Sequence, residues 1–295
     1  MNASVNPVSI GPISIGLIGG SGLYEMADLT ERQQHEIDTP FGRPSDPIMT
    51  GRLAGVPVAF LTRHGKGHRL IPSEVPYRAN IYALKLLGVR YAVSISAVGS
   101  MREEIRPLDL VLPDQYIDLT RRREGTFFGQ GAVAHVSMAR PVCAELLTVL
   151  ARSVEAAKLP GVGLHRGGSY VCIEGPTFST LAESLWYRSM NVSVIGMTAM
   201  PEAKLAREAQ IAYATLALVT DYDCWHPHEE HVTADMAFAN LIKNAANAQR
   251  VVINLVKELH AAPPPSVAHD ALASALVTPP AQMSAEVRER LRALL

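Results

Sequence analysis

Short apolar runs rich in β-branched residues alternate along the chain with longer segments of helical spacing. We predict strands at the runs SIGLIG, PVAFLTR, YAVSISAV, DLVLPDQYI, SYVCIEG, SVIGMT and YATLALVTD. Such runs, separated by helical segments, are typical of a mainly parallel or mixed sheet covered by helices. The pattern therefore predicts an α/β fold.

The helical patterns occupy residues 76–87, 141–158, 180–190, 201–209 and 233–260. Two starts are marked, because Thr180 with Glu183 gives a T-x-x-E capping box and Pro201 suits a first helical turn. We predict one domain over residues 1–262. Residues 263–295 are rich in Ala and Pro and then return to helical spacing, which indicates a C-terminal arm with a short terminal helix.

The composition is that of a globular protein and argues against nucleic-acid-binding, membrane and secreted proteins. The 295 residues are 48% hydrophobic and 19% charged, with a formal net charge of -1, so no broad electrostatic field favours nucleic acid or a membrane surface. No apolar run reaches the roughly 20 residues that span a bilayer, and the N-terminus does not have the pattern of a signal peptide. The three cysteines are odd in number and lack C-x-x-C spacing, which favours the reducing cytoplasm.

Polar or glycine-rich segments follow six of the apolar runs. In α/β sheets, ligands bind outside the carboxyl ends of the strands, so these segments are the candidate site. They are residues 19–22, 62–69, 96–100, 173–180, 197–202 and 221–223.

An anion site is suggested by the segments IGGSG and RHG. Glycine lets backbone amides and the Ser21 hydroxyl approach an anion closely, and Arg63 can fork two phosphate oxygens beside His64. Together with Ser96 and Thr198 they would make a compact phosphate cradle. Taken alone, IGGSG also fits a tight structural turn, and RHG also fits a solvated arginine with a capping histidine. Neither the P-loop nor the dinucleotide fingerprint is satisfied.

Two aspartates follow the last strand, Asp221 and Asp223. If the extended backbone runs through Tyr222, both carboxylates face one pocket. Two close carboxylates in a dry site do not both ionise cheaply, so one is expected to keep a proton and act as a donor. The alternative is a pair of loop aspartates that cap the following helix.

The segment HPHEEH raises the question of a metal site through His226, His228 and His231. The H-E-x-x-H pattern would need histidine at position 232, which is Val232, and no second ligand is at suitable range. We therefore predict a polar loop and no metal site.

Taken together, the motifs resemble the purine nucleoside phosphorylase superfamily, in its trimeric branch. The resemblance extends from about residue 15 to 260 through IGLIGGSGLY, DTPFGRPSD, RHGKGHRLIPSEVPYRANIYALK, SAVGSMREEIRPLDLVLPDQYIDLT, IEGPTFST, VIGMTAMPEAKLAREA and ATLALVTDYDCW. It implies a single α/β domain around a distorted mixed sheet and a homotrimer with active sites near subunit contacts. It also implies no cofactor, with inorganic phosphate as co-substrate.

The resemblance also assigns residues by position. It implies a phosphate site of Ser21, Arg63, His64, Ser96, Ala97 and Thr198. It implies that Met197 lies under the ribose and that the purine pocket contains Phe178, Ser179, Asp221 and Asp223. Less directly, it implies that His135 and Met138 of a neighbouring subunit close the 5′ side, and that Val232, Ala234, Ala237 and Phe238 line a methylthio pocket.

The implied reaction is phosphorolysis of 5′-methylthioadenosine to adenine and 5-methylthioribose 1-phosphate, a step of purine and methionine salvage. Asp221 would donate to N7 and Asp223 would support it or accept from the 6-amino group, and the two roles could be exchanged. A relative acting on adenosine, inosine or 5′-methylthioinosine remains the nearest alternative. An alternative from a different functional class is a nucleoside-binding or uptake module that does not catalyse a reaction. The glycine-rich first turn could also suggest a nicotinamide dehydrogenase, but the sequence lacks the dinucleotide fingerprint and the acidic residue that binds the ribose.

Overall fold

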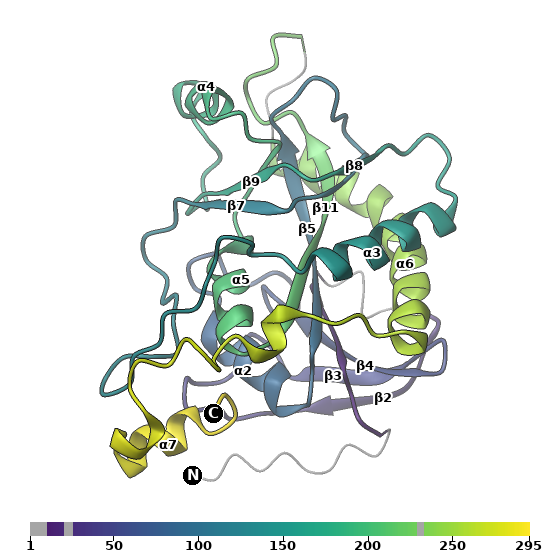
Figure 1. Cartoon of the computed structure of the whole chain (residues 1–295). Helices are drawn as coiled ribbons and strands as arrows, with labels where there is room; N and C mark the ends of the chain where they lie inside the picture. The colour runs from purple at the N-terminus through teal and green to yellow at the C-terminus, as the bar shows by residue number, and fades with distance from the viewer. Residues whose placement is uncertain (1–10, 21–25, 229–232) are drawn as a thin grey trace.

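The computed structural model describes residues 11–20, 26–228 and 233–295, except for the side chains of residues 236–238. A mixed sheet forms its centre and helices cover both faces (Figure 1). The strands are β1 Ile15–Gly19, β2 Leu29–His35, β3 Ile48–Leu53, β4 Val56–Thr62, β5 Tyr91–Ser100, β6 Leu110–Leu112, β7 Gln115–Asp118, β8 Leu164–Arg166, β9 Ser169–Cys172, β10 Val194–Gly196 and β11 Ala212–Asp221. The α-helices are α2 Tyr77–Leu86, α3 Ala144–Ala157, α4 Leu181–Ser189, α5 Ala199–Glu208, α6 Ala234–Ala261 and α7 Ala285–Leu291.

The sheet branches at β5, which accounts for its distortion. Strand β5 pairs in parallel with β1 and with β11, while its last two residues pair antiparallel with β10. Strands β1 and β4 are parallel, whereas β2, β3 and β4 form an antiparallel meander. The predicted α/β class with a mixed sheet is confirmed.

One predicted strand is divided in two. The run 109–117 forms β6, which pairs with β11, and β7, which pairs with β9. Pro113 lies between them and has no N–H to donate to a ladder, so the chain leaves one neighbour there and joins another. Strands β2, β3 and β8 were not predicted, because they lack a continuous apolar run.

The helices lie close to their predicted ranges. At α4, the Thr180 hydroxyl accepts from the Glu183 amide and the Glu183 carboxylate accepts from Thr180, so the capping box is confirmed. Helix α5 begins at Ala199, but the backbone at Met200 is not helical, and the regular turns start at Pro201.

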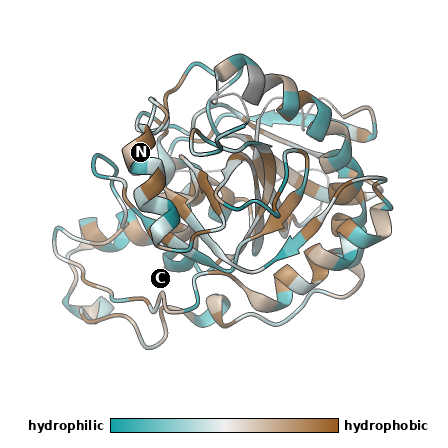
Figure 2. Ribbon diagram, turned by 90° about the horizontal axis from the view of Figure 1, so that it is seen from above, coloured by the Kyte–Doolittle hydropathy of each residue, from teal (hydrophilic) through white to brown (hydrophobic). Residues whose placement is uncertain are grey.

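Two apolar layers sandwich β5 and β11. Helices α2 and α5 pack on one face, and α3 and α6 on the other (Figure 1). Along β11, Ala217 and Val219 belong to the first layer and Leu216 and Leu218 to the second. A strand covered on both faces needs apolar residues at every position, which explains the unbroken apolar run. Figure 2 shows these hydrophobic strands inside and hydrophilic residues toward the periphery.

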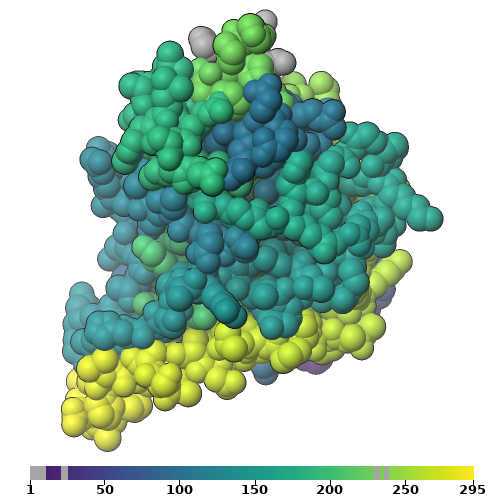
Figure 3. Space-filling model, turned by 45° about the horizontal axis from the view of Figure 1, so that its top comes forward, coloured from purple at the N-terminus to yellow at the C-terminus, as the bar shows by residue number. Residues whose placement is uncertain are grey.

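The C-terminal arm packs on the body of the protein. It runs along the lower side of the molecule in Figure 3 and ends in α7. Its buried side chains join the first apolar layer, namely Leu272, Ala275, Met283, Val287, Leu291 and Leu294. None of the described helices is long and apolar enough to cross a membrane.

We expect Leu291→Ala to lower the free energy of unfolding by about 2–5 kcal/mol, because the leucine is fully buried and its removal leaves a cavity. The matched control is Leu295→Ala, since Leu295 is 47% exposed. Urea unfolding of both variants measures the difference. Equal midpoints for the two variants would show that α7 does not contribute to the cooperative core.

Candidate active site

The candidate site lies at the ends of β4, β5, β10 and β11. Strand β10 runs antiparallel to β5, with Val194 opposite Ser100 and Ile195 opposite Gly99. The chain after Gly196 therefore heads back toward the middle of β5, where Ser96 lies. The carboxyl ends of β1 and β4 also lie level with the middle of β5. Because β10 runs antiparallel to β5, the residues that follow it, including Thr198, come near those ends.

Arg63 follows β4 and is only 2% exposed. Its Nε lies 2.8 Å from Glu202 Oε2, and its Nη2 donates to Glu202 Oε1 at 3.1 Å and to Ser94 Oγ at 2.6 Å. Burial alone would lower the pKa of Arg63, but the carboxylate of Glu202 raises it above its ordinary value. The interpretation of RHG as a solvated arginine is therefore wrong.

Glu202 ends the candidate segment 197–202, but no role was predicted for it from the sequence. It is 1% exposed, and besides Arg63 it accepts from the hydroxyl of Tyr213 at 2.8 Å. Two Arg63 nitrogens are thus held in one orientation by a carboxylate 139 residues away in the sequence. Glu202 and Ser94 accept from Nε and Nη2 of Arg63, and neither of them bonds to Nη1.

His64 stays neutral at physiological pH. Burial and the nearby charge of Arg63 lower its pKa to about 4. Its Nδ1 donates to the carbonyl of Leu70 at 2.9 Å, because a carbonyl oxygen can only accept. The ring also stacks on His68, with centroids 4.2 Å apart. Nδ1 therefore carries the proton, and Nε2 is the nitrogen left for a ligand.

Two predicted hydroxyls are buried at this end of the sheet. Ser96 Oγ on β5 has no hydrogen bond within the described part of the chain, and Ser179 Oγ, before α4, lies close enough to Asp223 to lower the pKa of that carboxyl. A buried hydroxyl without any partner costs about 1–3 kcal/mol, so in native proteins water or a ligand usually satisfies it. Thr198, 7% exposed, occupies the N-cap position of α5 with no side-chain capping bond. Ser21 lies outside the described residues.

The paired aspartates come together through a turn. Strand β11 ends at Asp221, and Asp223 lies in a turn with φ +56°, so the strand does not continue through Tyr222, the condition under which we expected both carboxylates to face one pocket. Instead, the Asp223 amide donates to Asp221 Oδ1 at 2.8 Å. Helix α6 begins only at Ala234, so the aspartates do not cap it. The close approach needs Gly99 on β5, where a Cβ would lie 2.9 Å from Asp221 Oδ1.

Both carboxyls are buried, with 5% and 4% of the residue exposed. Burial raises the pKa of Asp221, and the charge of Asp223 raises it further. Burial also raises the pKa of Asp223. Thr220 donates its hydroxyl to Asp221 at 2.6 Å, and Ser184 of α4 donates to Asp223 at 2.5 Å. The pair can therefore hold a proton more readily than ordinary carboxyls.

Residues expected at the purine and ribose positions lie on the loops that follow β9 and β10. Phe178 is 43% exposed, and the Ser179 carbonyl accepts from Cys224 Sγ at 3.4 Å. Met197 is half-buried beside Gly175, where a Cβ would approach its sulfur to 2.5 Å. The loop that follows β9 is thus in contact with the loops that follow β10 and β11.

Other predicted residues lie elsewhere in the chain. The exposed His135 donates its amide to the arm, at the Ala275 carbonyl, 2.8 Å away, and Met138 is half-buried in the same segment. That segment, between β7 and α3, descends to the level of α7 in Figure 1, away from the end of β11. Ala234 is exposed at the start of α6. Val232 and the side chains of Ala237 and Phe238 are outside the described structure.

Of the histidines of HPHEEH, His226 and His228 are in edge contact, with ring centroids 6.2 Å apart. His226 Nε2 lies 3.0 Å from Glu103 Oε1, and its ring stacks on Tyr222. The described residues contain no group of three or more His, Cys, Asp or Glu that could hold a metal ion. His231 lies outside them.

Comparison with known proteins identifies the family. A sequence model of the phosphorylase superfamily matches residues 14–257. S-methyl-5′-thioadenosine phosphorylase of Thermosynechococcus vestitus is 58% identical over 95% of this chain and 97% of its own. The enzyme of the same name from Synechocystis is 57% identical over 95% of this chain and 86% of its own.

Solved structures agree with this assignment. A methylthioadenosine phosphorylase from an Antarctic soil metagenomic library superposes with a TM-score of 0.93 at 61% identity, covering 97% of this chain and 100% of that one. Methylthioadenosine phosphorylase from Schistosoma mansoni in complex with adenine gives 0.80 at 36% identity, covering 84% and 92%. Because the family model matches most of the chain and relatives of more than half identity cover nearly all of it, the chain belongs to the phosphorylase superfamily.

Proposed function

We propose that the protein cleaves S-methyl-5′-thioadenosine with inorganic phosphate to give adenine and 5-methylthioribose 1-phosphate. The observation that carries the proposal is the buried Asp221 and Asp223 pair, whose pKa values are raised, at the same sheet end as the buried Arg63. Relatives of that name at 58% and 57% identity support the substrate.

Phosphate would bind in the cradle of Ser21, Arg63, His64, Ser96, Ala97 and Thr198. Cleavage develops positive charge on the sugar, so an anion held beneath C1′ stabilises the transition state as well as attacking it. The unpartnered Ser96 hydroxyl and the Nη1 of Arg63 supply donors for this anion, whose charge the buried guanidinium would balance.

Adenine would lie against Phe178 and Ser179, with Met197 under the ribose. A protonated Asp221 would donate to N7 as the base departs, and Asp223 would accept from the 6-amino group. A 6-oxo group would present lone pairs to that carboxylate, and a mismatch of this kind costs a polar site about 10⁴-fold in discrimination. The 6-aminopurine nucleosides are therefore favoured over inosine.

We infer a homotrimer in the cytoplasm, with no cofactor, that serves purine and methionine salvage. His135 and Met138 lie on a segment remote from the aspartates of their own chain, which supports their placement in a neighbour's site. Ala234, Ala237, Phe238 and Val232 would line the methylthio pocket. The family match ends at residue 257, which supports a catalytic domain over 1–262 and an arm over 263–295.

Product analysis tests the proposal. The protein is incubated with methylthioadenosine, adenosine or inosine, each with and without phosphate, and free base and sugar phosphate are measured. We expect adenine release from methylthioadenosine that requires phosphate, with inosine as the poorest substrate. A preference for inosine would overturn the reading of the base by Asp223. Binding without phosphate-dependent release would favour a non-catalytic module.

A further inference from the structure

A second buried arginine, Arg123, lies beside the site on a segment that the sequence motifs did not include. It follows β7, and its side chain is only 1% exposed. Its guanidinium lies 5.4 Å from the centre of the Tyr77 ring at the start of α2. A long cationic side chain is rarely buried to this degree without acceptors, and both terminal nitrogens of Arg123 have them, while Nε has no hydrogen bond among the described residues.

One half of the guanidinium engages the loop after β10. Arg123 Nη1 donates to the carbonyl of Met197 at 2.7 Å and to that of Met200 at 2.6 Å. The Tyr77 hydroxyl is a third acceptor, at 3.1 Å. These contacts hold the backbone on both sides of Thr198, the residue expected to bind phosphate.

The other half engages the loop after β9. Arg123 Nη2 donates to the carbonyl of Glu174 at 2.7 Å and lies 3.4 Å from that of Ile173. Its Nε lies 3.4 Å from Glu174 Oε1, and the other carboxylate oxygen accepts from the amide of Arg121 at 2.5 Å. This loop leads directly into Phe178 and Ser179.

We propose that Arg123 is a positioning residue for phosphorolysis, which ties the loop that carries the base-binding residues to the loop that carries the ribose- and phosphate-binding residues. The inference rests on the proposed function and deepens it. The planar guanidinium carries N–H groups on separate nitrogens, so Nη1 can reach Met197 while Nη2 reaches Glu174, whereas a lysine carries all its N–H groups on one nitrogen. A lysine ammonium in the same place would keep the charge and lose one of the two connections.

By connecting these two loops, Arg123 acts as a clamp that fixes the distance between the phosphate side and the purine side of the site. Phosphate on one side and purine on the other must be held at a reacting distance from C1′, and a misplacement of about 1 Å can cost 10²-fold in rate. The charge of Arg123 also reaches the phosphate side, because it is one of the influences that lower the pKa of His64. Geometry and charge can therefore be separated by two substitutions.

The test compares Arg123→Lys and Arg123→Gln in steady-state assays in which phosphate and methylthioadenosine are varied separately. We expect Arg123→Lys to lower kcat about 10- to 100-fold with little change in KM for phosphate, because a displaced loop misaligns the reactants. Arg123→Gln is expected to show the same loss of kcat and, in addition, a raised KM for phosphate.

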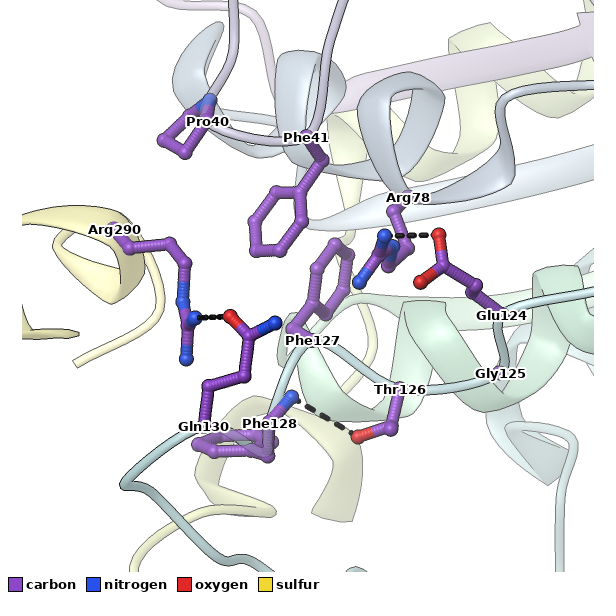
Figure 4. Close-up of a pocket in the computed structure, with 10 residues that line it drawn as sticks. All are labelled: Pro40, Phe41, Arg78, Glu124, Gly125, Thr126, Phe127, Phe128, Gln130 and Arg290. Atoms are coloured by element: carbon purple, nitrogen blue, oxygen red, sulfur yellow. Dashed lines mark hydrogen bonds and ion pairs between the residues drawn. The ribbon is translucent and has the colours of Figure 1, made fainter.

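The matched control is Arg78→Gln. Figure 4 shows Arg78 on the wall of a cavity of about 440 Å³, paired with Glu124, the residue next to Arg123 in the sequence. Its guanidinium packs over Phe41, 4.9 Å from the ring centre. The substitution loosens the same segment without touching either site loop, so kcat should stay at the wild-type value.

Each outcome decides the inference. Wild-type kinetics for Arg123→Lys, or an equal loss in Arg78→Gln, would overturn it. If Arg123→Lys does not fold, Arg123→Gln decides alone: a lower kcat supports the connection between the two loops, and an unchanged kcat refutes it. The wild-type assay separates the two proposals, because a wild-type chain without phosphate-dependent cleavage would refute the function itself.

Discussion

The variant Asp221→Asn is expected to release adenine about 10²–10⁴-fold more slowly than the wild-type chain, the usual contribution of a positioned general acid. Asparagine keeps the shape of the side chain and one acceptor oxygen for Thr220 or for the Asp223 amide. It has no proton to transfer to N7. The loss should therefore appear in kcat, measured at saturating phosphate and methylthioadenosine.

A buried aspartate outside the site gives the matched control. Asp109 is 2% exposed and bonds to His165 at 2.9 Å and to the Gly163 amide at 2.7 Å. Asp109→Asn should lower stability and leave kcat unchanged. If Asp223→Asn instead of Asp221→Asn abolished turnover, the proton would belong to Asp223. Full activity in both variants would refute acid catalysis by the pair.

The pH dependence follows from the direction of the pKa shifts. Burial raises the pKa of both Asp221 and Asp223, so the proton needed for base departure persists above the ordinary carboxyl range. We expect kcat to fall as the pH rises through the raised pKa, and Asp221→Asn to lack this limb. The same sign applies to stability: these carboxyls favour the fold most below their unfolded pKa, and their contribution declines as they ionise. The fall in kcat is measured from its dependence on pH at saturating phosphate and methylthioadenosine.

The sequence marked the candidate site residues that come at the end of an unbroken apolar run. Arg63 follows β4 and Asp221 ends β11, where composition alone marks both the strand and its end, whereas Ser96 lies in the middle of β5, which continues to Ser100. Periodicity could not show that Asp223 reaches Asp221 through a left-handed turn, because residues two apart predict one face only while the strand continues.

The supporting residues were missed because their partners are distant in the sequence. Glu202 meets Arg63 across 139 residues, and Ser184 meets Asp223 across 39. Arg123 lies among charged residues in REGTFF, a segment without a strand or helix pattern. Glu202 lies at the end of the candidate segment 197–202, but nothing in the sequence showed that its carboxylate would meet Arg63.

The second large effect is expected for Glu202→Gln, which removes the counter-charge of a buried arginine. Breaking a buried ion pair by neutralising one partner costs about 3–5 kcal/mol, because the remaining charge stays desolvated. Arg63 and Glu202 have side-chain exposures of 3% and 2%, so water cannot replace the lost carboxylate. We expect a matching loss in the free energy of unfolding, measured by urea unfolding without phosphate.

A surface pair supplies the comparison for that loss. Arg152 and Glu258 form an ion pair whose side chains are 54% and 30% exposed. Glu258→Gln should change stability by about 1 kcal/mol or less, since exposed ion pairs contribute little. Similar losses in Glu202→Gln and Glu258→Gln would contradict the buried character of the Arg63 pair.

Phosphate links this stability change to the proposed site. A ligand that binds only the folded protein stabilises it by RT ln(1 + [L]/Kd), so a tighter ligand stabilises it more. In Glu202→Gln the anion would be the main counter-charge left to Arg63. Added phosphate should therefore raise the unfolding midpoint of Glu202→Gln by more than that of the wild-type chain. A chain in which phosphate binds elsewhere would show the same increment in both proteins. The increment thus measures whether the buried guanidinium and the reacting anion share one site.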